Sequence, residues 1–172
     1  MSDLQDDEYR EKLLQFVEKL AMLLTEAGLP RMAARVFAYV LAEDSDKYTA
    51  KELADGLRVS PAAISGAVRP LVQGGMLTRG RDPGERADHY RVDDSDVWGT
   101  IISQRRPMLR RYIDVLSEGA RDLGGDRRGS RRLRETVEFY RFLDEDLTET
   151  MKRWKERRAE WVEEEERRIK ES

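Results

Sequence analysis

Two helix start signals lie close together at Thr49 and Ser60, and they constrain the fold more than any other feature. Thr49 opens a Thr-Ala-Lys-Glu capping box, in which its hydroxyl accepts a hydrogen bond from the first turn while Glu52 reaches back to the Thr49 amide. Ser60 and Pro61 form the second signal, because serine is a favoured N-cap and proline suits the first helical position. The pattern predicts two short helices joined by about three residues, which is typical of a helix-turn-helix.

A change of hydrophobic period follows the second of these helices. After Gly74-Gly75 the runs MLTRGR and HYRV are compatible with β-strands, and they flank the turn sequence Asp82-Pro-Gly-Glu85. Proline presets φ in such a turn and glycine supplies a positive φ. The segment therefore predicts a β-hairpin, and a helix-turn-helix with such a wing is a winged helix.

The segments on both sides of this motif predict helices. Apolar residues at steps of three and four predict one helix from about Asp7 to Ala27 and another from Pro30 to about Glu43, followed by a polar loop, AEDSDKY. After the wing, a helix begins at the acidic run 93–96 and ends in the Gly- and Arg-rich break GARDLGGDRRGS.

The last predicted helix runs from about Arg131 to Ile169 and carries a partial heptad stripe. Tyr140, Leu147, Trp154 and Trp161 are spaced by seven, but Asp144 and Arg158 interrupt the alternate position. A helix of about 60 Å cannot bury its apolar stripe against a small core, so we expect a second copy as its partner. The residues expected at this homodimer interface are Leu13, Val17, Tyr140, Leu147, Met151, Trp154 and Trp161.

These elements predict a mainly α fold with a small β-wing, in three parts. We expect N-terminal dimerisation and scaffold helices over 1–45, the winged helix-turn-helix over 46–94 and a helical dimerisation region over 95–172.

The distribution of charge matters more than the net charge of −3. Between Arg58 and Arg91 six arginines face three acidic residues, a net charge of +3, whereas the segment from Glu135 onward carries a net charge of −4. Local charge decides which surface meets phosphate, so the winged helix is the expected partner of duplex DNA.

The predicted recognition helix, from Ser60 to about Gln73, opens with small residues that allow close approach to base edges. Arg86 lies at the predicted wing tip and is the candidate for insertion into the minor groove. The residues expected to contact DNA are Ser60, Pro61, Ala62, Ala63, Ser65, Gly66, Arg69, Arg79, Arg81 and Arg86.

Enzyme, metal and membrane functions find little support. The single histidine, His89, falls on a predicted wing strand, and the sequence has no zinc-protease motif, nucleophile elbow or phosphate-binding glycine loop. The absence of cysteine excludes disulfides and thiolate metal sites. The N-terminus lacks signal-peptide features, and the longest fully apolar run, VFAYVLA, is too short for a membrane span. We expect a soluble cytoplasmic protein without cofactor, metal or membrane partner.

The sequence between about Phe16 and Arg134 resembles the MarR superfamily, in particular its GbsR-like branch and the mycobacterial repressors of efflux pumps within it. The resemblance rests on FVEKLAMLLTEAGLPRMAARVFAYVL, KELADGLRVSPAAISGAVRPLVQGGML and GSRRLRETVEFYRFL. Asp82 and Arg86 match the order of the acidic residue and tip arginine in the superfamily's wing, while Pro83-Gly84-Glu85 replaces a more basic tip.

This resemblance implies a dimeric, ligand-controlled repressor whose effector lies between the dimer and DNA-binding regions. The residues of a pocket for a small hydrophobic effector would be Phe16, Leu20, Phe37, Val40, Trp98, Ile101 and Ile102, and a plain hydrophobic core is the alternative interpretation of the same set. Two other functions stay open at this point: a winged helix that binds proteins, and a small-molecule-binding dimer without a DNA role.

Overall fold

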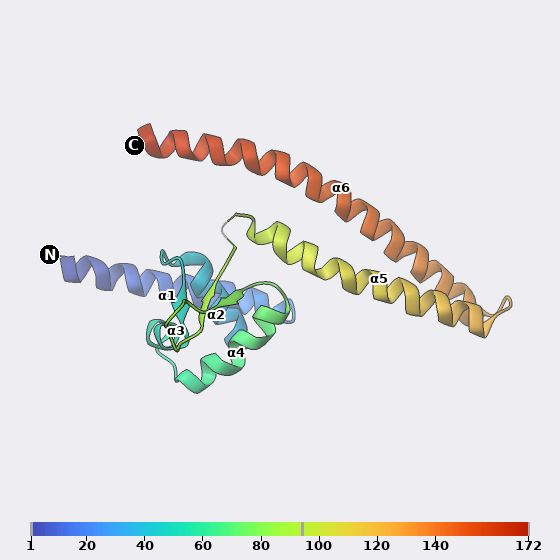
Figure 1. Cartoon of the computed structure of the whole chain (residues 1–172), viewed down its shortest axis with the longest axis horizontal. Coiled ribbons are helices and arrows are strands. Elements are labelled where there is room, and N and C mark those ends of the chain that lie inside the picture. The colour runs from blue at the N-terminus through green and yellow to red at the C-terminus, as the bar shows by residue number, and fades with distance from the viewer. Residues whose placement is uncertain (1, 94, 172) are drawn as a thin grey trace. The chain divides into compact units, whose positions relative to one another are not determined.

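The computed structural model of the chain describes residues 2–93 and 95–171 (Figure 1). In chain order the elements are α1 (Ser2–Glu26), α2 (Arg31–Ala42), β1 (Tyr48–Thr49), α3 (Ala50–Leu57), α4 (Pro61–Gln73), β2 (Thr78–Gly80), β3 (His89–Arg91), α5 (Val97–Leu123) and α6 (Arg128–Glu171). The predicted fold class, mainly helical with a small β-wing, is confirmed. The chain divides into two compact units between Ile101 and Ile102.

The first unit is built around one hydrophobic core that supports the helix-turn-helix from within. Helices α1 to α4 and the strands β1 and β3 contribute buried side chains. Burying one such side chain stabilises the fold by roughly 1.5–3 kcal/mol. The large apolar side chains that are almost fully buried are Val17, Val36, Phe37, Leu53, Leu57, Ile64, Leu71 and Leu77.

A three-stranded antiparallel sheet forms the wing, with the strand order β1-β3-β2. Tyr90 on the central strand β3 pairs with Tyr48 of β1 and with Arg79 of β2. The expectation of a loop throughout 42–48 is therefore wrong at Tyr48, which begins a strand. A strand of two residues is too short to show an alternating pattern, and its pairing with β3 depends on residues far along the chain.

Several helix ends differ from the sequence-based expectation. Helix α1 begins at Ser2, and α6 extends over Arg128–Glu171. The expected Gly- and Arg-rich break shrinks to residues 124–127, because Gly124 and Gly125 adopt φ values of +51° and +66° that reverse the chain within a few residues. Residues 1, 94 and 172, at the edges of predicted ranges, lie outside the described residues.

In the second unit, the part of α5 that follows Ile101 forms an antiparallel helical hairpin with α6 (Figure 1). The rings of Tyr112 and Tyr140 stack with centroids 5.5 Å apart, and the Arg106 Nε donates to Asp144 Oδ1 over 2.9 Å. Asp144 thus occupies a position of the apolar repeat of α6 and forms an ion pair there with Arg106 of α5. No described helix is both long and apolar enough to cross a membrane.

Candidate nucleic-acid interface

Helix α3 begins at the capping box that the sequence predicts. The Thr49 hydroxyl accepts from the Glu52 amide over 3.2 Å, and the Glu52 carboxylate accepts from the Thr49 amide over 2.7 Å. The Thr49 hydroxyl also donates to Glu52 Oε2, over 2.8 Å. The bonds from the Thr49 amide and hydroxyl hold the pKa of Glu52 below its usual range, because both favour the ionised carboxylate. The start of α3 is therefore set by local chemistry.

Helix α4 divides into a buried face and an exposed face. Ile64, Ala67, Val68 and Leu71 are buried against the core. The exposed residues that the sequence predicts at the DNA surface are Pro61, Ala62, Ser65, Gly66 and Arg69. The helix thus presents small residues near its N-terminus and an arginine one to two turns later, an arrangement that suits approach to base edges.

Two predicted contact residues at the start of α4 have additional structural roles. The Ser60 hydroxyl is exposed but accepts the Ala63 amide over 3.3 Å, so it acts as the N-cap. Ala63 itself is half-buried. Pro61 and Ala62 are exposed and lie at the positive end of the helix, where backbone amides favour phosphate.

The wing places two predicted arginines on one carboxylate. Asp88 Oδ1 lies 2.6 Å from Arg81 Nη2, and Asp88 Oδ2 lies 2.6 Å from Arg79 Nη2. The hydrogen bond from Arg81 and the charge of Arg79 lower the pKa of Asp88, so this carboxylate is ionised at neutral pH. Both arginine side chains remain more than half exposed.

A surface groove of about 430 Å³ joins α4 to the wing. Ser65, Arg69 and Gln73 contribute from the helix, and Arg79 and Asp88 contribute from the wing. The groove brings together three residues that the sequence predicts at the DNA surface, Ser65, Arg69 and Arg79. Gln73 and Asp88 are additional. Gln73 lies one helical turn after Arg69, so its place on the same face of α4 could have been predicted from helical spacing in the sequence. The position of Asp88, by contrast, depends on the pairing of β2 with β3.

Arg86 lies in the turn region of the wing, between β2 and β3. Gly84 adopts φ +88°, and the Glu85 amide donates to the Asp82 carbonyl over 3.1 Å. Asp82 forms an ion pair with Lys47, and the hydrogen bond from Lys47 lowers the pKa of Asp82. Arg86 is exposed and makes no ion pair with any described residue. Its guanidinium is therefore available to a ligand.

Comparisons with known proteins identify the family. The MarR family matches residues 27–87, and the family of MmpR5-like MarR family transcriptional regulators matches residues 96–157. The chain is 26% identical over 149 residues to the HTH-type transcriptional regulator MmpR5 of Mycobacterium tuberculosis (strain ATCC 25618 / H37Rv), a similarity that covers 86% of this chain and 90% of that protein. The chain is a MarR-family transcriptional regulator.

A solved structure of a transcriptional regulator has a similar fold. The crystal structure described as a transcriptional regulator matches 84% of this MarR-family chain and 99% of its own, with a TM-score of 0.76 and 25% identity. The family and this structural neighbour consist of transcriptional regulators, not enzymes.

The predicted effector-pocket residues of this MarR-family regulator lie in different environments. Phe37, Val40 and Ile101 belong to the hydrophobic core of the first unit, and Leu20 packs against it. Trp98 is 48% exposed and meets the Phe37 ring edge-on, with centroids 6.3 Å apart. Phe16 is 47% exposed. Ile102 is half-buried and belongs to the second unit.

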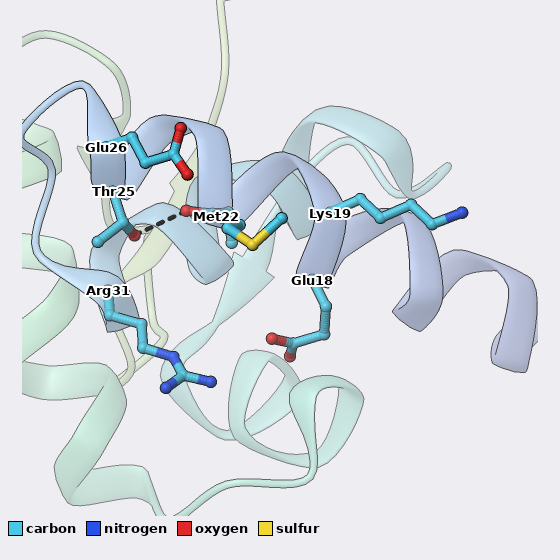
Figure 2. Close-up of a pocket in the computed structure, with 7 residues that line it drawn as sticks. Glu18, Lys19, Met22, Thr25, Glu26 and Arg31 are labelled. Atoms are coloured by element: carbon cyan, nitrogen blue, oxygen red, sulfur yellow. Dashed lines mark hydrogen bonds between the residues drawn. The ribbon is translucent and has the colours of Figure 1, made fainter.

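A different hollow, of about 500 Å³, lies along α1 (Figure 2). Glu18, Lys19, Met22 and Thr25 line it from α1, and Arg31 lines it from the start of α2. Figure 2 shows the Thr25 hydroxyl turned to the backbone of its own helix, where it donates to the Ala21 carbonyl over 2.7 Å. None of the residues predicted for an effector pocket lines this hollow.

The residues predicted at the dimer interface also lie in different environments, some buried and some exposed. Leu13 and Val17 pack into the core of their own chain, because α1 turns that face toward α2. The large apolar side chains that α1 leaves exposed are Tyr9, Phe16, Met22 and Leu23. On α6, Leu147, Met151 and Trp154 are half-buried, Tyr140 stacks on Tyr112, and Trp161 is 54% exposed.

Proposed function

We propose that this MarR-family regulator binds duplex DNA as a homodimer and acts as a repressor that is controlled by a small hydrophobic effector. The groove shared by α4 and the wing carries the proposal. It presents Arg69 and Arg79 together with the hydroxyl of Ser65, on a segment whose local charge is positive. A surface that binds protein or only a small molecule has no need of this arrangement.

The side chains of the groove suit the chemistry of the major groove. Arginine pairs with the O6 and N7 atoms of guanine, and serine accepts or donates to either a base or a phosphate. Arg86 suits the narrow minor groove, where negative potential is concentrated. In this arrangement α4 reads bases while the wing fixes the register on the duplex.

The exposed face of α1 supports the proposed dimer. Tyr9, Phe16 and Leu23 are spaced by seven residues and are 50%, 47% and 59% exposed. Apolar residues at this spacing form one stripe on a helix, and burying it against a second copy removes it from water. A two-fold dimer presents two copies of α4, so we expect a pseudo-palindromic operator with half-sites about 10 bp apart or a multiple of that.

The effector and the finer classification rest on the resemblance described above. Trp98 supports an apolar effector, because its half-exposed ring sits beside Phe37 at the edge of the core. Membership of the GbsR-like branch and action in the cytoplasm belong to the same proposal.

Selection of genomic fragments by the purified full chain at about 150 mM salt tests the proposal, since salt at this level suppresses non-specific binding. We expect enrichment of one pseudo-palindrome, confirmed by mobility shift. Enrichment no greater than with a non-specific control would refute DNA binding and favour a winged helix that binds protein.

A further inference from the structure

Asp88 lies between two arginines of the wing and uses one carboxylate oxygen for each. Oδ1 accepts from Arg81 Nε over 2.9 Å and from Arg81 Nη2 over 2.6 Å, while Oδ2 lies 2.6 Å from Arg79 Nη2. The Asp88 side chain is 20% exposed, whereas the arginines are 57% and 56% exposed. The carboxylate is therefore the inner member of the cluster, and the guanidinium groups face outward.

Strand register explains why these three residues meet. Arg79 pairs with Tyr90 and Gly80 pairs with His89, so the next step toward the hairpin tip sets Arg81 opposite Asp88. Arg79 lies in β2 and Arg81 directly follows its last residue, and residues two apart along an extended chain point to the same face of a sheet. Opposite charges across an antiparallel pair, and on its diagonal, are within reach of each other.

The cluster extends into the groove beside α4. Arg79 and Asp88 line this groove together with Ser65, Arg69 and Gln73. A guanidinium carries five N–H donors in a fixed plane, and the contact to Asp88 leaves several of them free on each arginine. Holding a long side chain in one orientation before binding reduces the entropy lost when it meets a ligand.

We propose that Asp88 is a positioning residue of the DNA-binding surface. Its carboxylate holds Arg79 in one orientation beside α4 and holds Arg81 in one orientation on the wing. It also offsets one of their two charges, which limits attraction to DNA of unrelated sequence. The inference rests on the proposed DNA binding. Sequence preference is the difference between the affinities for specific and unrelated DNA. Asp88 can therefore raise specificity although its carboxylate repels phosphate, if it weakens binding to unrelated DNA more than binding to the specific site.

Asp88→Asn tests this role, because the substitution keeps the shape of the side chain and removes its charge. Affinities are measured for the duplex that the parent enriches and for a scrambled duplex of equal length, over a salt series. We expect the variant to bind the scrambled duplex more tightly, with a steeper salt dependence, and to lose about tenfold of its preference for the enriched duplex.

Glu85→Gln is the matched control, since it removes the same charge from the same hairpin. Glu85 is exposed, and its side chain makes no ion pair with the described residues of the wing. We expect tighter binding to both duplexes and a preference within about twofold of the parent. Equal preferences in Asp88→Asn and Glu85→Gln would overturn the inference, because charge alone would then explain both variants.

A second measurement separates positioning from direct contact. In a chain that carries Arg79→Gln and Arg81→Gln, the further change Asp88→Asn should leave the preference unaltered, and a further tenfold loss would overturn the inference. Arg79→Gln alone should lower the preference, which keeps the inference testable if Asp88→Asn does not fold. A parent that prefers no sequence refutes the proposed function, whereas a selective parent with an equally selective Asp88→Asn refutes only the role of Asp88.

Discussion

Gly56 of α3 lies directly against the ring of Tyr39 on α2. A Cβ atom at position 56 would lie 2.3 Å from the Tyr39 hydroxyl oxygen and 2.5 Å from its Cζ atom. Tyr39 is 9% exposed and its ring also packs edge-on against Tyr48 of β1, so it has little room to move. This contact fixes how closely α3, and therefore the helix-turn-helix, approaches the scaffold.

Gly56→Ala should destabilise the protein although alanine is the better helix former. Overpacking of this kind costs about 1–3 kcal/mol and outweighs the roughly 1 kcal/mol that alanine contributes within a helix. Denaturant unfolding measures the difference. Gly66→Ala is the control, because apart from its own turn of helix nothing lies within 4 Å of the added Cβ, and it should stabilise the fold. A Gly56→Ala variant as stable as the parent would show that Tyr39 moves aside freely.

Arg86→Ala should weaken binding to the enriched duplex and to unrelated DNA alike. Loss of one phosphate-region contact lowers the slope of log affinity against log salt by about 1. Fluorescence titrations over a salt series measure this slope. Lys19→Ala removes the same charge from α1 and should leave the slope unchanged. A parent-like slope in Arg86→Ala would exclude the wing tip from the interface.

Arg69→Ala should change sequence preference as well as affinity. A bidentate arginine–guanine contact discriminates against other bases by roughly 1–3 kcal/mol, so binding should become tolerant at one position of each half-site. Affinities for single-base variants of the enriched duplex measure this tolerance. If Arg69→Ala lowers the affinity for all of these duplexes by the same factor, as we expect for Arg86→Ala, Arg69 does not contact a base specifically.

Leu23→Glu should shift the protein from dimer toward monomer while the monomer stays folded. Leu23 is 59% exposed in the single chain, so a carboxylate there is solvated until a partner covers it. We expect dimer dissociation constants to rise by about a hundredfold or more, measured by sedimentation equilibrium. Gln15→Glu, on the outer face of α1, is the control. Unchanged association of Leu23→Glu would place the dimer interface elsewhere.

Asp144→Asn should lower the free energy of unfolding at neutral pH by about 1 kcal/mol, since it removes a two-point contact with Arg106. The hydrogen bond and charge of Arg106 hold the pKa of Asp144 below its ordinary value. A carboxylate with a lowered folded pKa stabilises the fold above its unfolded pKa of about 3.9, and this contribution disappears as the pH falls through the folded pKa. The parent should therefore lose more stability than Asp144→Asn as the pH falls below about 4, as measured by thermal unfolding. Parallel pH curves would contradict the pairing.

Local signals predicted the elements that carry the proposed interface. The capping box at Thr49, the Ser60-Pro61 start and the turn around Gly84 each depend on residues only a few positions apart. The exposed face of α4 followed from helical periodicity, which also needs no distant partner. For this reason Ser65 and Arg69 were predictable at the surface.

Contacts between residues far apart in the sequence determine the remaining features of the fold and of the candidate interface. The sequence by itself determined two short helices, a β-hairpin and a long terminal helix, because capping, turn chemistry and periodicity act within one element. Only the tertiary structure decided that β1 pairs with β3, that Asp144 receives Arg106 and that Asp88 lies between Arg79 and Arg81. Strand register and helix packing create these neighbours, and neither leaves a mark in the local pattern of residues.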